Sequence, residues 1–395
     1  MSAASPLRVT LKPGRDKAAR QRHPWVYSGA VASIAGEGPP GAVGDLVDAK
    51  GDFIARGFVN RGSQIVFRAV SFRREEVDRT LLAARLEAAL GLRQRLLATG
   101  TEAYRLVNSE GDRLSGLVVD RYGPWLVVQI GSAGIERLKP LVVEVLAELL
   151  KPQGIYERSE SPARRDEGLE PATGVLAGVA PPERITVSEA GLKLVVDLQH
   201  GQKTGLFLDQ RPARLRVREL SRGQRVLDAF AYSGGFAVNA LAGGAAHVVA
   251  VERQAPMLEL LDAHIAANGL DGTRVEKVAG DVFRFLRDSD ERFDLIVLDP
   301  PPFAKKKSEV DGACRGYKEI HREAFKRLEP GGLLLSSSCS QHVDPWLFQQ
   351  LLFQASLEAG RQVQLVARSG QPEDHPVLLD HPEGEYLKVF FLRVL

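Results

Sequence analysis

The chain has 395 residues, of which 26% are charged and 44% are hydrophobic, and its formal net charge is +2. Because this length exceeds the usual size of one domain, we expect two or three domains, each with its own core. There is no run of about 18 apolar residues and no signal-peptide pattern, so we expect a cytoplasmic protein without a membrane-spanning helix. The two cysteines form no Cys-x-x-Cys pair, which argues against a disulfide scaffold and a metal site.

The N-terminal part of the chain is basic. Residues 1–74 contain 12 Lys and Arg against 5 Asp and Glu, whereas the remaining residues contain 40 against 45. Short β-like runs at 44–49 and 64–70, with a Gly-rich turn at 36–41, predict a small β domain at 7–72. A compact basic domain is typical of proteins that bind nucleic acid through its phosphates, although a well-solvated basic surface has the same composition.

The next part of the chain, residues 75–183, predicts an α+β domain. Leucines recur at helical spacing over 75–98, and a second helix is expected near 135–150. Two apolar β-like runs lie between these helices. The charged, turn-rich stretch 159–170 predicts an exposed loop.

From residue 184 onward, apolar strands alternate with helical stretches. The expected strands span residues 225–229, 247–251, 273–278, 293–298, 332–336, 363–366 and 387–392. Such alternation requires a mostly parallel sheet with helices on both faces, and the last strand, which follows a loop, can enter antiparallel. The fold class is therefore α/β, with a Rossmann-like domain at 184–395 after the β domain at 1–74 and the α+β domain at 75–183.

Acidic residues follow three successive strands of this predicted sheet, at the edge where open sheets bind ligands. Asp228 ends the first strand, ahead of Gly234 and Gly235, and Glu252 and Asp281 follow the second and third. The glycines allow backbone to approach a ligand, and the acids can accept hydrogen bonds from ribose hydroxyls and an adenine amino group. The first loop lacks the Gly-x-Gly-x-x-Gly of dinucleotide sites, so the pattern favours S-adenosylmethionine. Each acid taken alone is more simply a solvated or helix-capping carboxylate.

The fourth strand runs into the proline-rich loop 299–303, whose rigidity suits a surface that presses against a flat base, with Phe303 available for stacking. The fifth strand ends near Cys339. If these two strands are neighbours, Asp299 and Cys339 emerge side by side. A thiol at this edge can act as a nucleophile, whereas a buried filler cysteine is the ordinary alternative.

A nucleophilic thiol indicates one kind of methyl transfer. C5 of cytosine or uracil is a poor nucleophile, and thiolate addition at C6 makes it reactive, whereas methylation at nitrogen needs no thiol. The second cysteine, Cys314, is more simply a small, partly buried residue ahead of a helix. Lys305, Arg315 and Lys318 lie in the same stretch and predict a basic rim for RNA phosphates.

Four motifs together resemble the bacterial RlmI family: residues 201–211, the Asp-Pro-Pro-x-Phe loop, Gly-Ala-Cys-Arg-Gly-Tyr-Lys at 312–318 and Ser-Cys-Ser at 338–340. The resemblance covers nearly the whole chain. It implies an N-terminal PUA domain, a central α+β domain and a class I S-adenosylmethionine-dependent methyltransferase domain. Members of this family act in rRNA processing by making 5-methylcytosine in 23S ribosomal RNA.

The resemblance also implies roles for individual residues. Cys339 matches the family's candidate nucleophile, the segment 203–211 would fold over the cofactor, and 228–236 would hold its methionine part. Glu252 would hold the ribose, and Asp281 with the next residue would face the adenine. The implied cofactor contacts are Lys203, Thr204, Gly205, Phe207, Asp209, Gln210, Arg211, Asp228, Phe230, Tyr232, Ser233, Gly234, Gly235, Phe236, Glu252, Arg253, Asp281, Val282, Asp299 and Pro300.

One departure from the family pattern leaves the mechanism open. Other RNA 5-methylcytosine enzymes have a second cysteine after the proline of the fourth-strand loop, where this chain has Pro301 and Pro302. Asp299 and Cys314 are therefore the candidates for the base that removes the C5 proton and for product release.

Two alternative functions remain. Asp-Pro-Pro-aromatic loops also serve methylation of exocyclic amino groups of adenine or guanine, and a catalytically inactive RNA-binding factor is a third reading. The predicted partner is 23S rRNA, naked or within a large-subunit intermediate, with a homodimer as an option and no membrane.

Overall fold

The structure is a computed structural model that describes residues 7–304 and 306–395. The chain folds into two compact units. The first comprises the residues up to Ile185 together with Asp197–Leu206 and Glu373–Gly384, and the second comprises Thr186–Val196, Phe207–Pro372 and Glu385–Leu395. Each unit is therefore built from several stretches of chain.

The first unit begins with a six-stranded sheet, as the short β-like runs predict. In spatial order its strands are β2 (Trp25–Tyr27), β6 (Ile65–Ser71), β5 (Phe53–Val59), β4 (Ala42–Val47), β1 (Arg8–Leu11) and β3 (Val31–Ala35). Strands β1 and β4 are parallel, and the other neighbours are antiparallel. The short helix α1 (Lys17–Arg20) follows β1, and Val9, Leu46 and Phe67 lie in the core.

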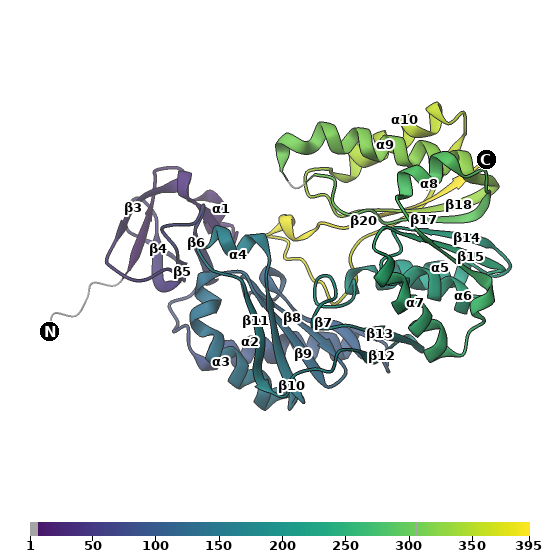
Figure 1. The fold of residues 1–395 in the computed structure, drawn as a ribbon. Coiled ribbons are helices and arrows are strands. Elements are labelled where there is room, and N and C mark those ends of the chain that lie inside the picture. The colour runs from purple at the N-terminus through teal and green to yellow at the C-terminus, as the bar shows by residue number, and fades with distance from the viewer. Residues whose placement is uncertain (1–6, 305) are drawn as a thin grey trace. The chain divides into compact units, whose positions relative to one another are not determined.

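A five-stranded sheet forms the rest of the first unit. Its strands, in spatial order, are β11 (Ala172–Gly178), β10 (Gly154–Ser159), β9 (Trp125–Ile130), β8 (Leu117–Tyr122) and β7 (Ala103–Asn108). Helices α2 (Arg79–Leu96) and α3 (Ala133–Leu150) pack together on one face of it (Figure 1). Each helix has an N-terminal cap, because the side chains of Asp78 and Ser132 accept hydrogen bonds from backbone N–H groups. The expected α+β organisation is confirmed.

The expectation of an exposed loop at 159–170 is met only in part, because most of its side chains are exposed but the stretch is not wholly a loop. A short helix, α4 (Pro162–Asp166), forms there, and Arg164 and Glu167 are only 4% and 3% exposed. Arg164 forms an ion pair of 2.7 Å with Glu136 of α3. A local run of charged residues predicts solvent exposure only when these residues have no partners of opposite charge elsewhere in the chain. Here such partners lie on distant segments.

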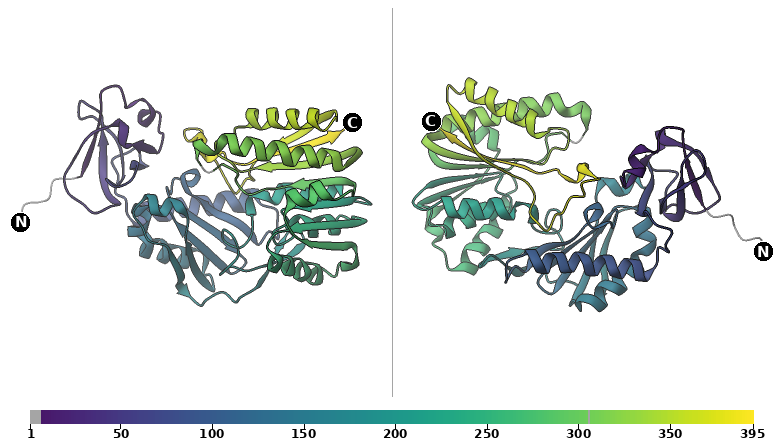
Figure 2. Two further views of the ribbon diagram at one scale, coloured as in Figure 1. Left: turned by 45° about the horizontal axis from the view of Figure 1, so that its top comes forward. Right: turned by 180° about the vertical axis from the view of Figure 1, so that it is seen from behind.

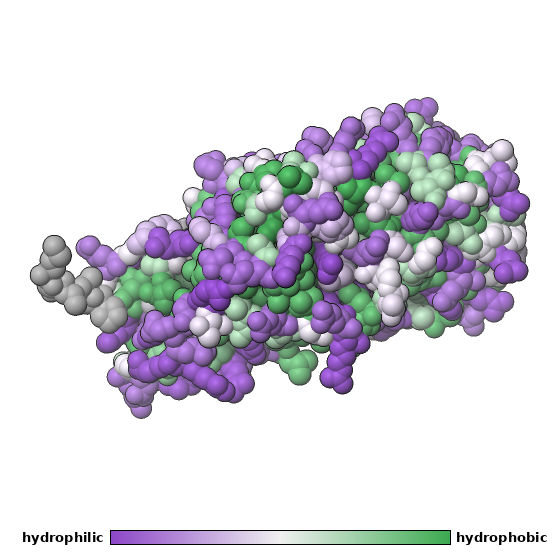
Figure 3. Space-filling view, turned by 90° about the horizontal axis from the view of Figure 1, so that it is seen from below, coloured by the Kyte–Doolittle hydropathy of each residue, from purple (hydrophilic) through white to green (hydrophobic). Residues whose placement is uncertain are grey.

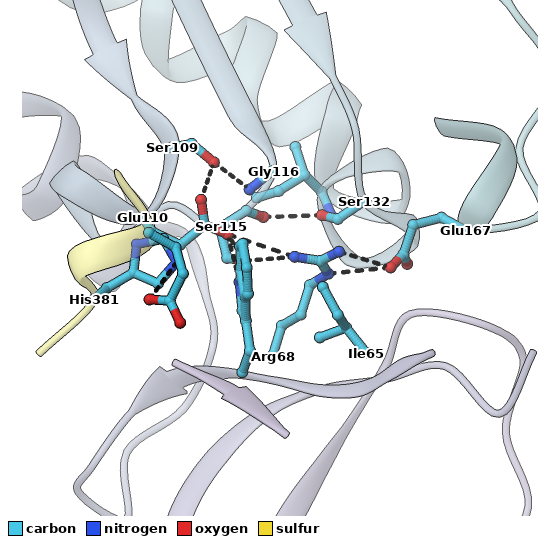
Figure 4. A network of polar contacts seen from close by, with 12 residues as sticks. Ile65, Arg68, Ser109, Glu110, Ser115, Gly116, Ser132, Glu167 and His381 are labelled. Carbon is cyan, nitrogen blue, oxygen red and sulfur yellow. Dashed lines mark hydrogen bonds and ion pairs between the residues drawn. The ribbon is translucent and has the colours of Figure 1, made fainter. Parts of the chain in front are cut away.

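Figure 4 shows the polar network that joins the two sheets of the first unit. Arg68 of β6 donates to Glu167 at 2.9 Å and to Glu110 at 3.4 Å, and the Ser115 hydroxyl also donates to Glu110. Burial by itself raises the pKa of Glu167, but Arg68 and hydrogen bonds outweigh burial and hold the pKa below its ordinary value. Glu167 therefore depends on the buried guanidinium of Arg68, whereas Glu110 is held mainly by Ser109 and Ser115.

The late segment Glu373–Gly384 belongs to the first unit through specific contacts. Arg93 donates to the carbonyl oxygen of Asp374 at 2.7 Å, and the carboxylate of Asp374 accepts from the backbone N–H of Arg105 at 2.9 Å. Near the end of the segment, the rings of His381 and Trp25 lie 4.4 Å apart. Residues close to the C-terminus thus complete a unit that begins at the N-terminus.

A seven-stranded sheet forms the centre of the second unit. In spatial order its strands are β16 (Val275–Ala279), β15 (His247–Glu252), β14 (Arg225–Ala229), β17 (Phe293–Leu298), β18 (Leu328–Ser338), β20 (Lys388–Val394) and β19 (Val363–Ser369). The first five strands are mutually parallel, and β20 is antiparallel to both its neighbours. The expected strands and the antiparallel entry of the last one are confirmed.

Helices cover both faces of this sheet, with α5, α6 and α7 on one side and α8, α9 and α10 on the other (Figures 1 and 2). Their bounds are α5 (Arg211–Leu220), α6 (Gly235–Ala242), α7 (Ala255–Asn268), α8 (Val282–Asp288), α9 (Val310–Arg327) and α10 (Pro345–Glu358). The hairpin β12 (Ile185–Glu189) and β13 (Leu192–Val196) precedes them. The 3-10 turns are η1 (Ser28–Ala30), η2 (Ser109–Asp112), η3 (Leu208–Gln210), η4 (Gly272–Arg274), η5 (Lys307–Glu309) and η6 (Pro382–Gly384).

Helix α9 corrects one expectation. Cys314 lies inside it rather than ahead of it, because the helix already begins at Val310. Gly312 and Gly316, which weaken a helical prediction, are accommodated within the helix. Its buried side includes Tyr317 and Phe325, which belong to the core of the second unit.

The surface is mixed in character. Hydrophilic side chains cover much of the face drawn in Figure 3, with apolar residues scattered among them, as is usual for folded domains. Among the described residues, none of the helices has the length and apolar character needed to cross a bilayer.

Candidate functional site

The carboxyl ends of four parallel strands of the second unit meet at one edge of its sheet. Strand β14 pairs with β15 on one side and with β17 on the other, so Ala229 lies opposite both Val251 and Leu298. The acids that follow these strands are close enough to affect one another, because Asp299 and Glu252 both contribute to the pKa of Asp228. The sequence predicts that Asp228, Glu252 and Asp281 gather at this edge, and the charges that act on Asp228 are those of Glu252 and Asp299.

Asp228 is the most perturbed acid of this edge. Its side chain is fully buried, and Oδ2 accepts a hydrogen bond of 2.8 Å from the backbone N–H of Ala237 in α6. Oδ1 is buried without a hydrogen-bond partner among the described residues. Burial raises the pKa of Asp228 to about 7, and the charges of Asp299 and Glu252 contribute. A buried acceptor in this state suits a ligand that brings a positive charge or a hydrogen-bond donor.

The loop after β14 has a strained backbone. Phe230 and Tyr232 have φ angles of +66° and +50°, in the left-handed region that bulky side chains rarely adopt. Gly234, with a φ angle of +78°, is the N-cap residue of α6, and a Cβ atom there would lie 2.6 Å from Leu261. Strain of this kind concentrates at functional sites, where the surrounding structure enforces it. Ser233, Gly235 and Phe236 complete the loop and the first turn of α6, and Ser233 and Phe236 are buried.

Glu252 fixes this loop in place. Its Oε2 accepts from the backbone N–H of Tyr232 at 2.9 Å and its Oε1 from that of Gln254 at 2.8 Å. Asp281 instead forms the N-cap of α8, where Oδ1 accepts from the backbone N–H of Arg284 at 3.0 Å. The helix-capping role weighed for such acids therefore applies to Asp281. Arg253 and Asp281 are exposed, and Val282 is buried.

The segment 203–211 is divided between the two units, because the boundary falls after Leu206. In the first unit, Thr204 is buried and its hydroxyl hydrogen-bonds with Asp120 at 2.6 Å and with Tyr122 at 2.8 Å. Gly205, with φ of +128°, is buried beside it, whereas Lys203 is exposed. Sequence reasoning does not reveal these partners.

The rest of this segment lies in the second unit, where it reaches the strand edge. Gln210 Nε2 donates a hydrogen bond of 2.8 Å to Oδ1 of Asp299, and the hydroxyl of Tyr386 donates to Asp209 at 2.7 Å. The ring of Phe207 packs edge-on against that of Tyr232 at 5.4 Å. Arg211, 6% exposed, begins α5.

A buried ion pair anchors the same segment. Arg214 of α5 forms two hydrogen bonds with Glu189, of 2.8 and 2.6 Å, and a third with the carbonyl oxygen of Phe207. Both charged side chains are almost completely buried. This bidentate geometry fixes the start of α5 and the residues before it.

The second part of the edge carries the thiol. Strands β17 and β18 are parallel neighbours with Leu298 opposite Ser336, so Asp299 and Cys339 leave the sheet at the same end, both half-buried. The hydroxyl of Tyr317 hydrogen-bonds with those of Ser338 and Ser340, at 2.9 and 3.0 Å. The residues on either side of Cys339 are therefore held by α9.

Lys388 is a residue that the sequence analysis misses. Its Nζ donates a hydrogen bond of 2.7 Å to the carbonyl oxygen of Ser340. The sequence does contain a signal for this residue, since it is a lysine within the otherwise apolar stretch 387–392. Such a lysine has to bury its charge or lie outside the sheet.

The proline-rich loop and Cys314 lie around this edge. Pro300 is buried and the next two prolines are exposed. The ring of Phe303 lies 4.7 Å from that of Tyr317 and so packs toward α9. Cys314 is half-buried against the core, and burial, with the charge of Asp311, raises the pKa of its thiol. These contacts favour a structural role for Cys314.

The three basic residues of the predicted rim have different settings. Arg315 is exposed, and Lys318 forms an ion pair of 2.9 Å with Glu358 of α10. Lys305 lies outside the described residues. The described residues contain no cluster of metal-ligating side chains.

The site fits an adenosyl ligand with a cationic amino-acid part. Asp228 Oδ1 and Gln210 Oε1 are buried acceptors without a hydrogen-bond partner among the described residues. An ammonium group provides the donors and the positive charge that such acceptors lack. The strained, glycine-containing loop that follows Asp228 is the kind of backbone that approaches a ligand closely.

Comparison with known proteins extends these observations. A family model described as S-adenosylmethionine-dependent methyltransferase matches residues 166–392, and a model described as PUA-like domain matches residues 9–72. The chain is similar to "Ribosomal RNA large subunit methyltransferase I" of Shigella boydii serotype 4, with 43% identity over 98% of this chain and 100% of that protein. The protein of the same name from Escherichia coli O139:H28 is 42% identical over the same shares.

Two solved structures have the same fold. A putative methyltransferase from Streptococcus mutans aligns with a TM-score of 0.85 at 22% identity, over 98% of this chain and 100% of that chain. A putative methyltransferase complexed with SAH aligns with a TM-score of 0.86 at 23% identity over the same shares.

Proposed function

This chain belongs to the RlmI family of S-adenosylmethionine-dependent methyltransferases, and from that membership we propose that it methylates C5 of a cytosine in 23S ribosomal RNA, with Cys339 as the nucleophile. The names of the relatives support ribosomal RNA of the large subunit as the substrate. The choice of C5 and of a thiol mechanism depends on the residues at the strand edge.

One observation carries the proposal: a half-buried thiol and a carboxylate leave neighbouring parallel strands at the same end. Cys339 follows β18 and Asp299 follows β17. Such an arrangement lets a nucleophile and a proton acceptor reach the same pyrimidine ring. Methylation at C5 of a pyrimidine requires both groups. Methylation at a nitrogen atom would leave the thiol without a role.

The residues of the cofactor site follow from the same edge. S-adenosylmethionine, when bound, supplies an electrophilic methyl group. In this proposal, Asp228 and Gln210 offer their buried oxygens to its amino-acid part, and Glu252 and Asp281 are assigned to its ribose and its adenine. Phe207 and Tyr232 form an edge-to-face aromatic pair that joins the segment before α5 to the loop after β14.

Cys339 and Asp299 divide the chemistry between them. The Cys339 thiolate adds to C6 of the cytosine, and electron density moves to C5, which then accepts the methyl group. Asp299 removes the C5 proton, and the bond between sulfur and C6 breaks, which restores the thiolate. The hydrogen bond from Gln210 orients Asp299 for that step. We assign no chemical step to Cys314, because it packs against the core.

The basic N-terminal domain is proposed to hold the RNA. It matches a PUA-like family model and carries the excess of positive charge. C5 and C6 of a stacked base are inaccessible, so the target cytosine has to leave its helix before it reaches Cys339. Arg315 of α9 is exposed and suits a phosphate contact.

Two alternatives make different predictions. An amino-group methyltransferase would use Asp299 and would tolerate loss of Cys339. An inactive RNA-binding factor would fail to bind S-adenosylmethionine in calorimetry, which the buried acceptors of the site argue against.

The decisive experiment uses unmethylated 23S rRNA and labelled S-adenosylmethionine, followed by digestion to nucleosides and mass spectrometry. Label in 5-methylcytidine supports the proposal. Label in methylated adenosine or guanosine overturns it in favour of the amino-group reaction, and no label, together with no cofactor binding, favours the inactive factor.

A further inference from the structure

Lys388 is a buried lysine beside the proposed nucleophile. It opens β20, where its backbone pairs with Ser338 of β18, and only 8% of its surface is exposed. Its Nζ donates to the carbonyl oxygen of Ser340 at 2.7 Å. The lysine therefore contacts the residue before Cys339 through its backbone and the residue after it through its side chain.

The charge of this lysine lacks an ordinary partner. Among the described residues, Nζ has no carboxylate at ion-pair distance. A buried ammonium without an anion is costly, and burial accordingly lowers the pKa of Lys388. The charges of Cys339, Asp344 and Glu385 raise that pKa, and Cys339 contributes most of the three. Asp344 is already engaged as the N-cap of α10.

We propose that Lys388 is a positioning residue that holds its ammonium group beside Cys339 and stabilises the thiolate form of that side chain. The inference rests on the proposed function, since it gives a cause for the reactivity that methylation at C5 needs. An ordinary cysteine has a pKa of about 8.5 and is mostly protonated at neutral pH, whereas cysteines beside a cation have lower values.

Other groups around Cys339 act in different directions. Asp299, directly after β17, carries a negative charge that disfavours a thiolate. Tyr317 on α9 contacts the serines on either side of the cysteine, and burial, with the charges of Cys339 and Asp299, raises the pKa of its hydroxyl. Tyr317 is therefore neutral at the pH of an assay and acts as a hydrogen-bonding group. Among the described residues, Lys388 supplies a positive charge that offsets Asp299 and favours the thiolate.

The reaction balances without proton transfer by the lysine. The Cys339 thiolate donates an electron pair to form the bond to C6, and later receives that pair again when the bond breaks after the C5 proton has left. Lys388 keeps its proton in both steps. Its contribution is the electrostatic stability of the anion at the start and end of the cycle.

The test measures the reactivity of Cys339 toward iodoacetamide as a function of pH. The chain has only two cysteines, so the full-length Cys314→Ser variant provides a single reporter thiol. Mass spectrometry follows its alkylation without RNA or cofactor. In this background we expect the rate to reach half its maximum at or below about pH 7.5.

Lys388→Met should move this midpoint upward by at least about one pH unit, which means roughly tenfold slower alkylation near pH 7. Lys388→Gln, which keeps a hydrogen-bond donor but loses the charge, should behave in the same way, and Lys388→Arg should retain the low midpoint. Lys326→Met removes an exposed lysine of α9 and should have no effect.

An unchanged midpoint in Lys388→Gln overturns the inference. If the methionine variant fails to fold, the comparison of glutamine with arginine still decides, because the two differ in charge. The assay also separates the two proposals. A shifted midpoint without any 5-methylcytidine refutes the cytosine reaction alone, and an unshifted midpoint in an enzyme that requires Cys339 refutes only the role of Lys388.

Discussion

Gln210 Nε2 donates a hydrogen bond of 2.8 Å to Asp299 Oδ1 and so ties the residues before α5 to the end of β17. The contact connects a segment expected to lie over the cofactor with the proposed base. Because the acceptor carries a charge, the contact contributes more than a bond between neutral groups.

Replacement of Gln210 by methionine should therefore loosen Asp299. We expect kcat for methyl transfer to fall roughly tenfold, corresponding to about 1.4 kcal/mol, with a smaller change in the urea midpoint of unfolding. Gln210→Glu places a second carboxylate beside Asp299 and should be worse than methionine. Equal activity of all three proteins would show that this bond does not orient the base.

The two cysteines form a matched pair for mutation. Cys339→Ala should abolish formation of 5-methylcytidine, because the thiolate addition to C6 is lost. Cys314→Ser should retain most activity and lose some stability, since Cys314 packs against the core. Nucleoside mass spectrometry after single-turnover reactions measures both, and activity of Cys339→Ala on cytosine would rule out the thiol mechanism.

Asp228 predicts a pH dependence of stability. Burial raises its pKa from 3.8 to about 7, so the folded chain binds this proton more tightly than the unfolded chain. The resulting contribution favours folding below pH about 4 and is lost as the pH rises through 7, at a cost of at most roughly 4 kcal/mol. Asp228→Asn should therefore stabilise the cofactor-free protein more at pH 8 than at pH 5, as urea titrations at both values would reveal.

The same group predicts how cofactor affinity varies. Affinity for S-adenosylmethionine should rise between pH 6 and 8 as Asp228 becomes charged, because the ligand is cationic. The control is the affinity of Asp228→Asn measured by calorimetry at the same pH values. Its pH dependence reflects only the protonation of the ligand. A wild-type curve parallel to that of the variant would exclude Asp228 as the cause.

The surface around α1 predicts a salt effect. Arg15, Lys17 and Arg22 are exposed and form no ion pairs among the described residues. Their joint replacement by glutamine should weaken RNA binding and reduce the slope of log K against log salt by about 2. Filter binding over a range of salt concentrations measures this. Removal of residues 1–74 is a poorer test, because it also takes Arg68 away from the buried Glu167.

A second triple variant controls for loss of charge. Arg274, Arg284 and Lys326 are exposed in the second unit, each paired with a nearby carboxylate. Glutamine at these positions should leave the salt slope nearly unchanged. If both triples reduce it equally, the RNA contact is not specific to the N-terminal domain.

The buried pair of Glu189 and Arg214 predicts a stability effect. Glu189→Gln leaves the guanidinium without its anion and should cost about 3–5 kcal/mol. The exposed pair of Glu219 and Arg216 is the control, and Glu219→Gln should cost less than about 0.5 kcal/mol. Denaturant unfolding compares the two, and similar costs would mean that the buried pair is not a special anchor.

Regular alternation made the sheet of the second unit predictable. The strands at 225–229 and 293–298 have the expected bounds, because apolar runs bounded by turns carry their own signal. The adjacency of β17 and β18, on which the placement of Asp299 and Cys339 depends, follows from the usual order of such sheets.

Contacts between distant residues were not predictable. The burial of Glu167 depends on Arg68, about a hundred positions earlier, and the hydroxyl of Thr204 donates a hydrogen bond to Asp120, 84 positions earlier. Lys388 shows the same limit, since its partner is the backbone of a residue on another strand. A local sequence pattern indicates which side chains are buried, but it does not indicate which residues they contact.

The segment Glu373–Gly384 has a consequence for biosynthesis. The chain emerges from the ribosome with its N-terminus first, and domains usually fold as they emerge. The first unit cannot complete its contacts in that order, because Arg93 and Trp25 contact Asp374 and His381, which are synthesised last. Nascent chains arrested before residue 373 should hold an incomplete first unit, so its final closure is delayed until translation is almost finished.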